Sequence, residues 1–336
     1  GVIGVLLSFV GKKKKAPLIG GIFKGDNPLK LQEINMKHRF PLRNKLMIIF
    51  GLLILTVGFI LSVLAIRTAR KAVTEKVATH LIDKATDTAE ILDGRVNSFF
   101  QFFEGIARTP ILRDSTLSYQ EKTAYLMKEA SFNSKVHKMN ICDMNGIRYA
   151  DNGQKINVSD RDYFMSAAKG KNFIAEPIVS RLDGHFVLAC TVPIYDDDHN
   201  VISVLLATIE ASALSNDISD IVVGKTGYCY ILGLTGTIIA AKDFTRVEQM
   251  ENVQKMAESN ASFKSLADFE KMALKTDISS IGFYTYNHIN KVASYAKMKT
   301  TGWTVILSAP VNEFMGAVNA LRTTMIGIGI SVLIGA

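Results

Sequence analysis

The sequence is poor in cysteine, proline and tryptophan, with three Cys, seven Pro and one Trp in 336 residues. Three cysteines at these spacings build neither a disulfide framework nor a cysteine-based zinc site. We therefore expect Cys142, Cys190 and Cys229 to be buried free thiols. A phosphate-binding loop is also excluded, because Gly224-Lys225-Thr226 has Ser219 where that motif requires glycine.

No set of catalytic residues stands out in the sequence. The six histidines show no metal-ligand spacing, and the run Asp196 to His199 is more typical of a solvated hairpin than of a metal site. No motif places a nucleophile beside a base. The sequence therefore predicts no enzyme within this chain, no cofactor and no metal, although an output domain after Ala336 could be enzymatic.

Charge is missing from two apolar stretches, residues 46–66 and 323–336. The first has 21 uncharged residues, and a helix of about 20 residues crosses a hydrocarbon core of ~30 Å. We predict a transmembrane helix over 46–66, and over 323–336 the start of a second one that is cut short. Because 46–66 lacks a cleavage site, it is expected to be a retained anchor and not a signal peptide.

The net charge of +8 is concentrated at one end of the chain. Ten of the 39 Lys and Arg residues lie in residues 1–45, beside only two acidic residues, and the rest is balanced. This favours a cytoplasmic segment over 1–45 and argues against a nucleic-acid partner. Residues 67–322 would then be extracytoplasmic, in a multi-pass protein of the cell inner (plasma) membrane. Met36 opens the basic run before the anchor and is a candidate natural start, in which case residues 1–35 would be upstream sequence or the tail of something longer.

The segment between the two apolar stretches has a mixed pattern. Apolar residues spaced by three and four from Val73 to Ile106 predict a stalk helix over 67–108, which Pro110 ends. Strands and turns follow, and strands are predicted over Phe173–Val179 and Phe186–Tyr195 among others. Ile141–Ala150 aligns weakly with Ile231–Ala240 as strand, tight turn and strand. The predicted fold class is α/β (α+β). Its parts are a distal module at about 109–220, a proximal module at about 221–309 and an exit helix at 310–322.

Four short motifs make the pattern more specific. They are Met36–Phe50, Ser159–Phe164, Gly224–Ile231, and Thr301–Val305 followed by Ala309-Pro310. Together they resemble the double Cache (dCache_1) sensor of bacterial methyl-accepting chemotaxis proteins, over residues 36–336. The resemblance implies two PAS-like Cache modules flanked by transmembrane helices, with a small ligand in the distal module. The same sensor precedes histidine kinases and diguanylate cyclases.

The resemblance also implies a ligand site. Arg161 and Tyr163 occupy the motif positions that bind a ligand carboxylate, which a guanidinium suits by its paired donors. The aspartate expected to bind an amino group falls at Thr208, and an expected tyrosine falls at Ile178. We therefore expect a small carboxylate or other polar metabolite rather than an ordinary α-amino acid. The remaining candidates for the ligand site are Phe164, Asn140, Arg181 and Thr191.

Structural alternatives exist for the same residues. Ser159 followed by Asp162 is a helix-capping pattern, and Arg161 could pair with Asp143 or Asp183. For Asn140, Arg181 and Thr191 a structural role is favoured over ligand contact.

Three functions fit the sequence. The first is a transmembrane chemoreceptor, a homodimer in membrane lipid, which senses a small extracellular ligand and signals to a chemotaxis kinase pathway through a missing cytoplasmic region. The second is the sensor of a membrane histidine kinase or diguanylate cyclase. The third is a membrane-tethered adhesion or scaffold module.

Overall fold

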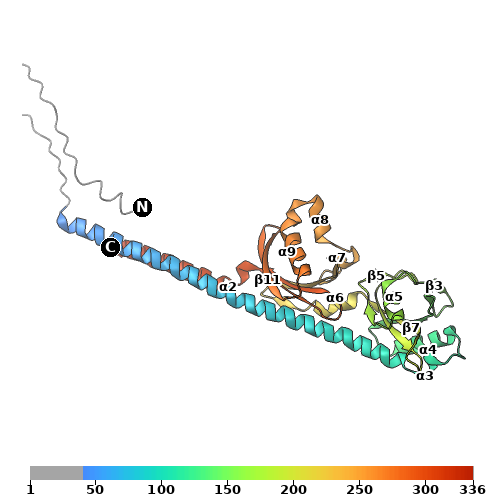
Figure 1. Cartoon of the computed structure of the whole chain (residues 1–336). Coiled ribbons are helices and arrows are strands. Elements are labelled where there is room, and N and C mark those ends of the chain that lie inside the picture. Colours follow the sequence, from blue (N-terminus) through green and yellow to red (C-terminus); the bar gives the residue numbers. More distant parts are fainter. Residues whose placement is uncertain (1–40, 336) are drawn as a thin grey trace, which may run out of the picture. The chain divides into compact units, whose positions relative to one another are not determined.

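The structure is a computed structural model that describes residues 41–335, so the predictions for residues 1–40 lie outside the described residues. The first described element is the helix α2 (Leu42–Ala107), drawn in blue to cyan in Figure 1. Its apolar half is exposed, and within residues 41–335 it is the one helix that is long and apolar enough to cross a membrane. The helix α10 (Gly316–Gly335) does not meet that criterion.

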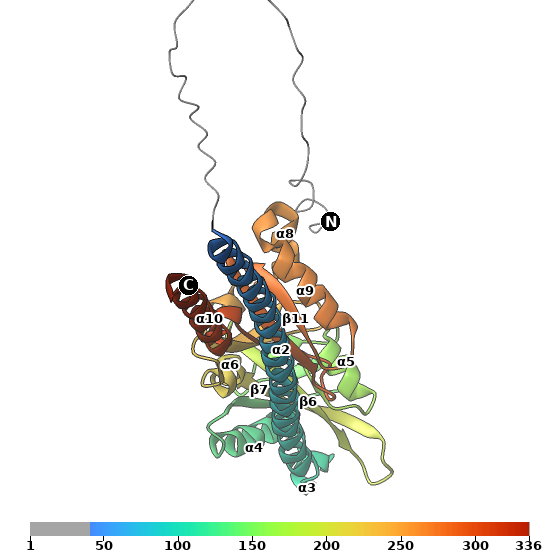
Figure 2. The ribbon, with the colours of Figure 1, turned by 90° about the vertical axis from the view of Figure 1, so that its left-hand side faces the viewer.

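The second half of α2 is amphipathic and supports the modules. Its buried side chains recur every three or four residues, as the sequence predicts, and include Leu81, Leu92, Val96 and Phe103. The helix ends at Ala107, before a short helix that begins with a proline, α3 (Pro110–Arg113). Figure 2 shows α2 passing in front of strands of both modules.

We call the unit built on the first sheet the distal module, because it lies farther along α2 from the apolar half. Its strands run in the order β3-β2-β1-β7-β6-β4, β5 pairs with β6, and all pairings are antiparallel. Its elements are α4 (Tyr119–Ser131), β1 (Val136–Cys142), β2 (Ile147–Tyr149), β3 (Lys155–Asn157), α5 (Asp162–Ala168), β4 (Phe173–Ile174), β5 (Ile178–Val179), β6 (Phe186–Tyr195), β7 (Val201–Glu210) and α6 (Ser212–Ile218).

The second sheet forms the proximal module. Its antiparallel strands run in the order β10-β9-β13-β12-β11, and β8 pairs with β9. Its elements are β8 (Val222–Val223), β9 (Gly227–Leu232), β10 (Ile238–Ala241), α7 (Thr245–Glu248), α8 (Val253–Ser259), η1 (Ala261–Phe263), α9 (Lys264–Lys275), β11 (Ser280–Tyr286), β12 (Ile289–Lys297), β13 (Thr304–Pro310) and η2 (Val311–Glu313). The α/β class and the pair of modules on a long helix are confirmed.

Two expected elements differ from the structure. The strand predicted over Phe173–Val179 is split into β4 and β5, because Pro177 lacks the N–H that a ladder hydrogen bond requires. The exit helix predicted at 310–322 begins only at Gly316, after the 3₁₀ turn η2. The three cysteines are free and buried, as expected, and burial raises the pKa of the Cys142 thiol to about 12.

Polar contacts attach the proximal module to the stalk helix α2 and to the segment that leads into α10. The carboxylate of Asp93 on α2 accepts the backbone N–H groups of Lys299 (2.5 Å) and Thr300 (3.0 Å), in the turn between β12 and β13. Farther along the chain, Glu313 in η2 accepts the backbone N–H of Lys225 at 2.6 Å. The start of the proximal module is therefore held to the segment that leads into α10.

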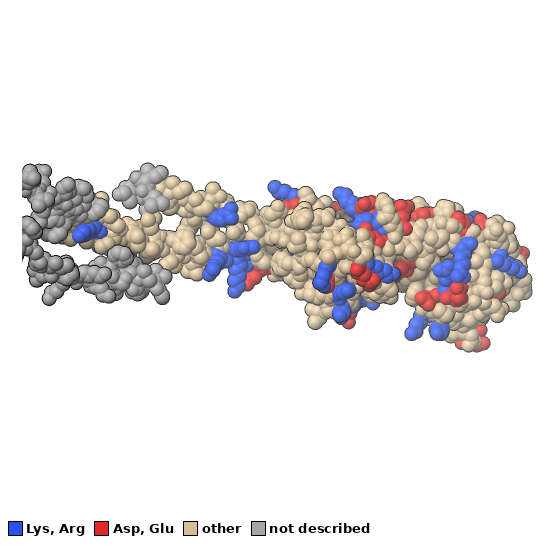
Figure 3. All heavy atoms as spheres, turned by 90° about the horizontal axis from the view of Figure 1, so that it is seen from above, with Lys and Arg blue, Asp and Glu red and all other residues tan. Residues whose placement is uncertain are grey.

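The charged side chains are unevenly distributed. Both signs of charge gather on the modules, whereas α10 and the neighbouring turns of α2 are largely uncharged (Figure 3). Ser62 of α2 donates a hydrogen bond to the sulfur of Met325 in α10 over 3.7 Å, so these two helices lie side by side there.

Candidate functional site

A narrow cleft in the distal module lies between the start of α5, the strand β5 and the faces of β6 and β7. Its internal volume is about 10 Å³, which is room for about one water molecule. The lining residues are Arg148, Val158, Arg161, Tyr163, Ile178, Val179, Ser180, Arg181, Val187, Ala189, Leu206 and Thr208. Three of them carry a guanidinium, and none of these twelve residues is acidic.

Arg161 stands at the N-cap of α5, where its backbone is extended and its side chain makes no capping bond. The Nε atom of Arg161 is buried and has no hydrogen-bond partner among the described residues. The capping alternative is not realised, because Ser159 donates its hydroxyl hydrogen to Asn157 Oδ1 over 2.7 Å. Arg161 thus lines the cleft and has a donor that the described residues around it leave unused.

The carboxylates that could have paired with Arg161 are engaged elsewhere. Asp143 accepts the backbone N–H of Ile147 (2.9 Å) and the hydroxyl of Tyr149 (3.0 Å). Asp183 lies 3.1 Å from the Nζ of Lys138. An ion pair between Arg161 and either aspartate is not part of the structure over residues 41–335.

Arg148 on β2 is a second cation at the cleft, and it is only 3% exposed. Its Nε (2.9 Å) and Nη2 (2.5 Å) both donate to Oδ1 of Asn140, a neutral partner. Within the described chain Arg148 has no ion pair with a carboxylate. Its burial lowers the pKa of the guanidinium from its usual value. A buried cation without a counter-ion is costly, so this arrangement favours an anion in the cleft.

Sequence reasoning missed Arg148, although a signal was present. Arg148 is the central residue of the short strand β2, which follows the Asn145-Gly146 turn. Its side chain points to the opposite face from those of Ile147 and Tyr149, and this central position is buried. A charged residue on the inward face of a strand needs a partner. Asn140, a candidate from the sequence, is that partner and accepts the hydrogen bonds of Arg148 through Oδ1. The Nδ2 of Asn140 is itself buried without a partner among the described residues.

Arg181 is the third cation and is already paired. It binds both carboxylate oxygens of Asp160, over 2.8 and 2.7 Å. The hydrogen bond from Arg181 lowers the pKa of Asp160 to about 2. Of the three guanidinium groups, Arg148 and Arg161 therefore remain to attract an anion.

The other expected residues divide into two groups. Tyr163, Ile178 and Thr208 line the cleft, and the hydroxyl of Thr208 donates to the carbonyl of Lys138 over 3.3 Å. Phe164 is packed in a hydrophobic cluster, and Thr191 donates to the carbonyl of Tyr163 over 2.7 Å. The structure places these last two residues behind the cleft and not in its lining.

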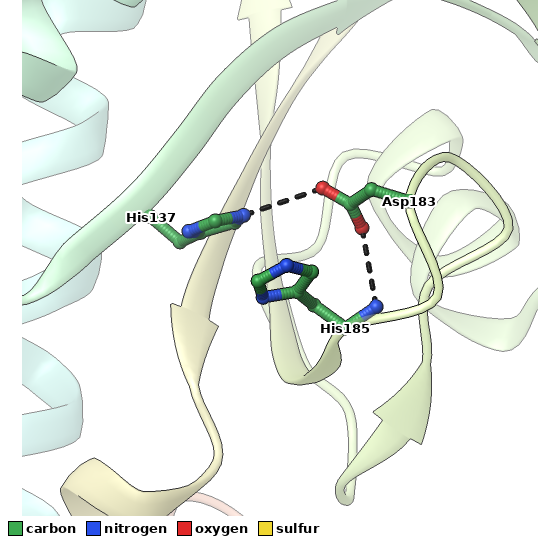
Figure 4. Close-up of side chains that lie close together, drawn as sticks. All are labelled: His137, Asp183 and His185. Atoms are coloured by element: carbon green, nitrogen blue, oxygen red, sulfur yellow. Dashed lines mark hydrogen bonds and ion pairs between the residues drawn. The ribbon is translucent and has the colours of Figure 1, made fainter.

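A second polar cluster lies at the rim of the same sheet face. The side chains of His137, Asp183 and His185 offer ligand atoms that all lie within 4.8 Å of one another (Figure 4). No spacing in the sequence points to this cluster, because His137 is on β1 and the other two residues are in the turn between β5 and β6.

Comparisons with known proteins agree with this architecture. A family model described as Cache domain (dCache_1) matches residues 65–318. The methyl-accepting chemotaxis protein TlpA of Bacillus subtilis (strain 168) is 26% identical over 192 residues, which are 56% of this chain. The match spans about a quarter of that relative, 26% of its length.

Solved structures show the same fold at low identity. The ligand-binding domain of the Pseudomonas fluorescens chemoreceptor CtaA, in complex with L-isoleucine, has a TM-score of 0.58 and 14% identity, covering 74% of this chain and 99% of its own. The ligand-binding domain of Mlp24 with asparagine has a TM-score of 0.53 and 14% identity, covering 74% and 99%. The extracellular domain of the putative histidine kinase mmHK1S-Z3 has a TM-score of 0.57 and 13% identity, covering 73% and 98%. With the family model matched over most of its length, the chain belongs to the Cache domain family.

Proposed function

We propose that this chain is the sensor portion of a transmembrane chemoreceptor and that its distal module binds a small anionic metabolite. The observation that carries this proposal is the pair of arginines Arg148 and Arg161, which line a cleft that has no acidic lining residue and which have no carboxylate partner within residues 41–335. A carboxylate accepts two parallel hydrogen bonds from such a group and neutralises its charge. Tyr163, Ile178 and Thr208 would complete the ligand contacts.

The same lining argues against an ordinary α-amino acid. An ammonium group needs an anionic or carbonyl partner when it leaves water. Thr208 stands where the resemblance places an aspartate, and its hydroxyl already donates to a carbonyl. Two structural neighbours are complexes with L-isoleucine and with asparagine, but this cleft offers a second cation instead of a carboxylate. A short dicarboxylate suits two guanidinium groups better.

Signal transfer would pass through the proximal module into α10. A ligand shifts an equilibrium between two sensor states only by its different affinity for them. In the proposed topology α2 and α10 both span the inner membrane, with residues 67–322 outside the cytoplasm. The exposed side chains of Ile326, Ile328 and Ile330 would then face lipid or the second chain of a homodimer. Chemotaxis signalling proteins would bind a cytoplasmic region after Ala336.

A second candidate is the sensor of a membrane histidine kinase. The extracellular domain of a putative histidine kinase has the same fold as this chain. The cleft chemistry is the same in both cases, since only the output differs. Residues after Ala336 distinguish the two, because a chemoreceptor continues into long heptad-bearing helices and a kinase into a catalytic domain.

Calorimetry on the full chain in lipid nanodiscs tests the ligand class. Succinate, acetate, L-isoleucine and L-asparagine are the probes, and succinate is expected to bind most tightly. Arg161→Ala should weaken succinate binding by at least tenfold, since a hydrogen bond to a charged group is worth about 1.5 to 3 kcal/mol. Arg95→Ala, which removes a surface ion pair with Asp217 at 2.9 Å, is the matched control. Tighter binding of either amino acid than of succinate would refute the proposal.

A further inference from the structure

Two histidines and an aspartate converge at one end of the distal sheet. His137 Nε2 lies 3.3 Å from Asp183 Oδ2, and the rings of His137 and His185 are stacked with their centroids 4.6 Å apart. Figure 4 shows His137 coming from β1 while Asp183 and His185 come from the turn before β6. The turn is tight, because Gly184 adopts a φ of 73° and its N–H donates to the carbonyl of Ser180 over 3.0 Å.

A second carboxylate orients the imidazole rings. Glu210 Oε1 lies 3.1 Å from Nδ1 of His137 and 3.6 Å from Nδ1 of His185. If Nδ1 of His137 carries the hydrogen and donates to Glu210, then its Nε2 keeps a lone pair directed toward Asp183. Metal-binding histidines have this arrangement, in which the distant ring nitrogen donates to a carboxylate that holds the ring and its tautomer in place.

We propose that His137, His185 and Asp183 form a binding site for Zn²⁺, with Glu210 as a positioning residue. Imidazole nitrogen with one carboxylate is a ligand set of zinc, whereas calcium and magnesium prefer oxygen ligands alone. The side chains of His137 and Asp183 are 22% and 20% exposed, and His185 is 52% exposed, so an ion can reach them. Binding draws the three ligand atoms closer, which the more exposed His185 ring permits by rotating.

Lys138 opposes metal binding at this site. Its Nζ lies 3.1 Å from the same Asp183 oxygen that faces His137. A zinc ion at this oxygen would be repelled by the ammonium group, so Lys138 must turn away when the metal binds. Removing that charge should therefore strengthen zinc binding, whereas a site that merely needs Lys138 for its shape would be weakened.

The site continues the face that lines the ligand cleft. Successive side chains of a strand point to opposite faces, so every second residue lies on the same face. His185, directly before β6, therefore continues the row formed by the cleft residues Val187 and Ala189. Glu210 follows Thr208 on β7 in the same way, and Val187 pairs with Glu210 across the two strands. A bound zinc ion would therefore cross-link the turn between β5 and β6 to β1 at the rim of the cleft, through His137 on β1 and Asp183 and His185 in the turn.

The test uses the full chain in nanodiscs, purified without a polyhistidine tag, and zinc chloride as the titrant. Calorimetry should show one high-affinity site per chain that His137→Ala and His185→Ala each abolish. Glu210→Gln should lower the affinity about 10- to 100-fold, as is typical for a residue that supports a metal ligand. Lys138→Met should raise it. The matched control is His80→Ala, an exposed histidine on α2, and calcium chloride is the control metal.

Circular dichroism of each variant checks that it remains folded. Cobalt(II) in place of zinc should give visible absorption bands that His137→Ala removes, a signature that a purely structural role would not produce. Zinc affinity that is unchanged in the His137→Ala/His185→Ala double variant, or calcium binding equal to that of zinc, would overturn the proposal. No anionic ligand enters the titration, so its result is independent of the proposed chemoreceptor function.

Discussion

Glu176 Oε1 accepts a hydrogen bond from the backbone N–H of Leu234 over 2.6 Å, and this contact joins the two modules. Glu176 lies two residues before Ile178, which lines the proposed ligand cleft, whereas Leu234 is in the turn between β9 and β10. Gly233 permits the close approach, because a Cβ at that position would lie 2.4 Å from the carboxylate of Glu176. Movement of β5 would therefore be transmitted to the proximal module at this point.

We expect Glu176→Ala to separate ligand binding from the response of the proximal module. Hydrogen exchange of the backbone amides in the turn between β9 and β10 is the measurement, with and without a saturating anionic ligand. The wild-type protein should show a ligand-dependent change there, and the variant should show little or none, with its affinity within about threefold of wild type. An unchanged response in the variant would show that coupling takes another route.

Glu270 should make the stability of the proximal module depend on pH. Its carboxylate is fully buried, Oε1 accepts from Tyr230 over 3.1 Å, and Oε2 has no partner in the described chain. Burial raises the pKa of Glu270 to about 8, well above its unfolded value, so the folded state binds the proton more tightly. The resulting stability is fully present below about pH 4.5 and is lost as pH rises through 8, by about 1.4 kcal/mol per pH unit between these values.

Thermal unfolding across pH 5 to 8 measures this effect, and Glu270→Gln is the decisive variant because it imitates the protonated carboxyl. The melting temperature of the wild-type protein should fall more steeply with pH than that of the variant. Glu248→Gln, at an exposed position, controls for the general loss of one negative charge. Parallel pH profiles for the wild-type protein and Glu270→Gln would contradict the prediction.

Asp93 should contribute more to stability than other acidic residues of the stalk. It is 8% exposed and accepts two backbone N–H groups, so Asp93→Ala leaves both donors without their charged acceptor. We expect a loss of at least about 2 kcal/mol in unfolding free energy. At roughly 2 to 4 °C per kcal/mol for a domain of this size, the fall in melting temperature is readily measured. Asp87→Ala, at an exposed position of the same helix, should change stability by less than about 0.5 kcal/mol.

Arg148 and Asn140 should be replaceable together without loss of stability. Burying a cation beside a neutral amide is unfavourable, and replacing both partners by apolar groups of similar shape is often neutral or stabilising. The double variant Arg148→Met/Asn140→Leu should therefore melt at or above the wild-type temperature in the absence of ligand, while succinate binding is lost. A large fall in melting temperature would show that the pair is kept for structural reasons.

Local sequence patterns predict most of the fold, because each depends on neighbours in the chain. The apolar stripe of α2 follows from helical spacing, and β6 agrees at both ends with the run Phe186–Tyr195. The break between β4 and β5 also follows from a local feature, Pro177, although the apolar pattern alone predicts one continuous strand there. Pro177 forbids a continuous ladder regardless of the apolar residues around it.

The site was less predictable because it depends on contacts between distant residues. Arg161 and Tyr163 belong to a contiguous motif, so the resemblance located them. Arg148 reaches the cleft only because β2 pairs with β1 in one particular register. His137 and His185 likewise meet through the pairing of β1, β7 and β6. A strand register of this kind cannot be predicted from one sequence in which apolar and polar residues alternate only weakly.

The small volume of the cleft, which holds about one water molecule, affects the apparent affinity for any larger ligand. If the resting form admits no metabolite, binding first requires a minor form in which β5 and the following turn have moved outward. The observed dissociation constant is then the intrinsic one divided by the fraction of molecules in that open form. Substitutions that destabilise the closed position of β5 and this turn would lower the apparent dissociation constant without touching the ligand, and substitutions that stabilise the closed position would raise it.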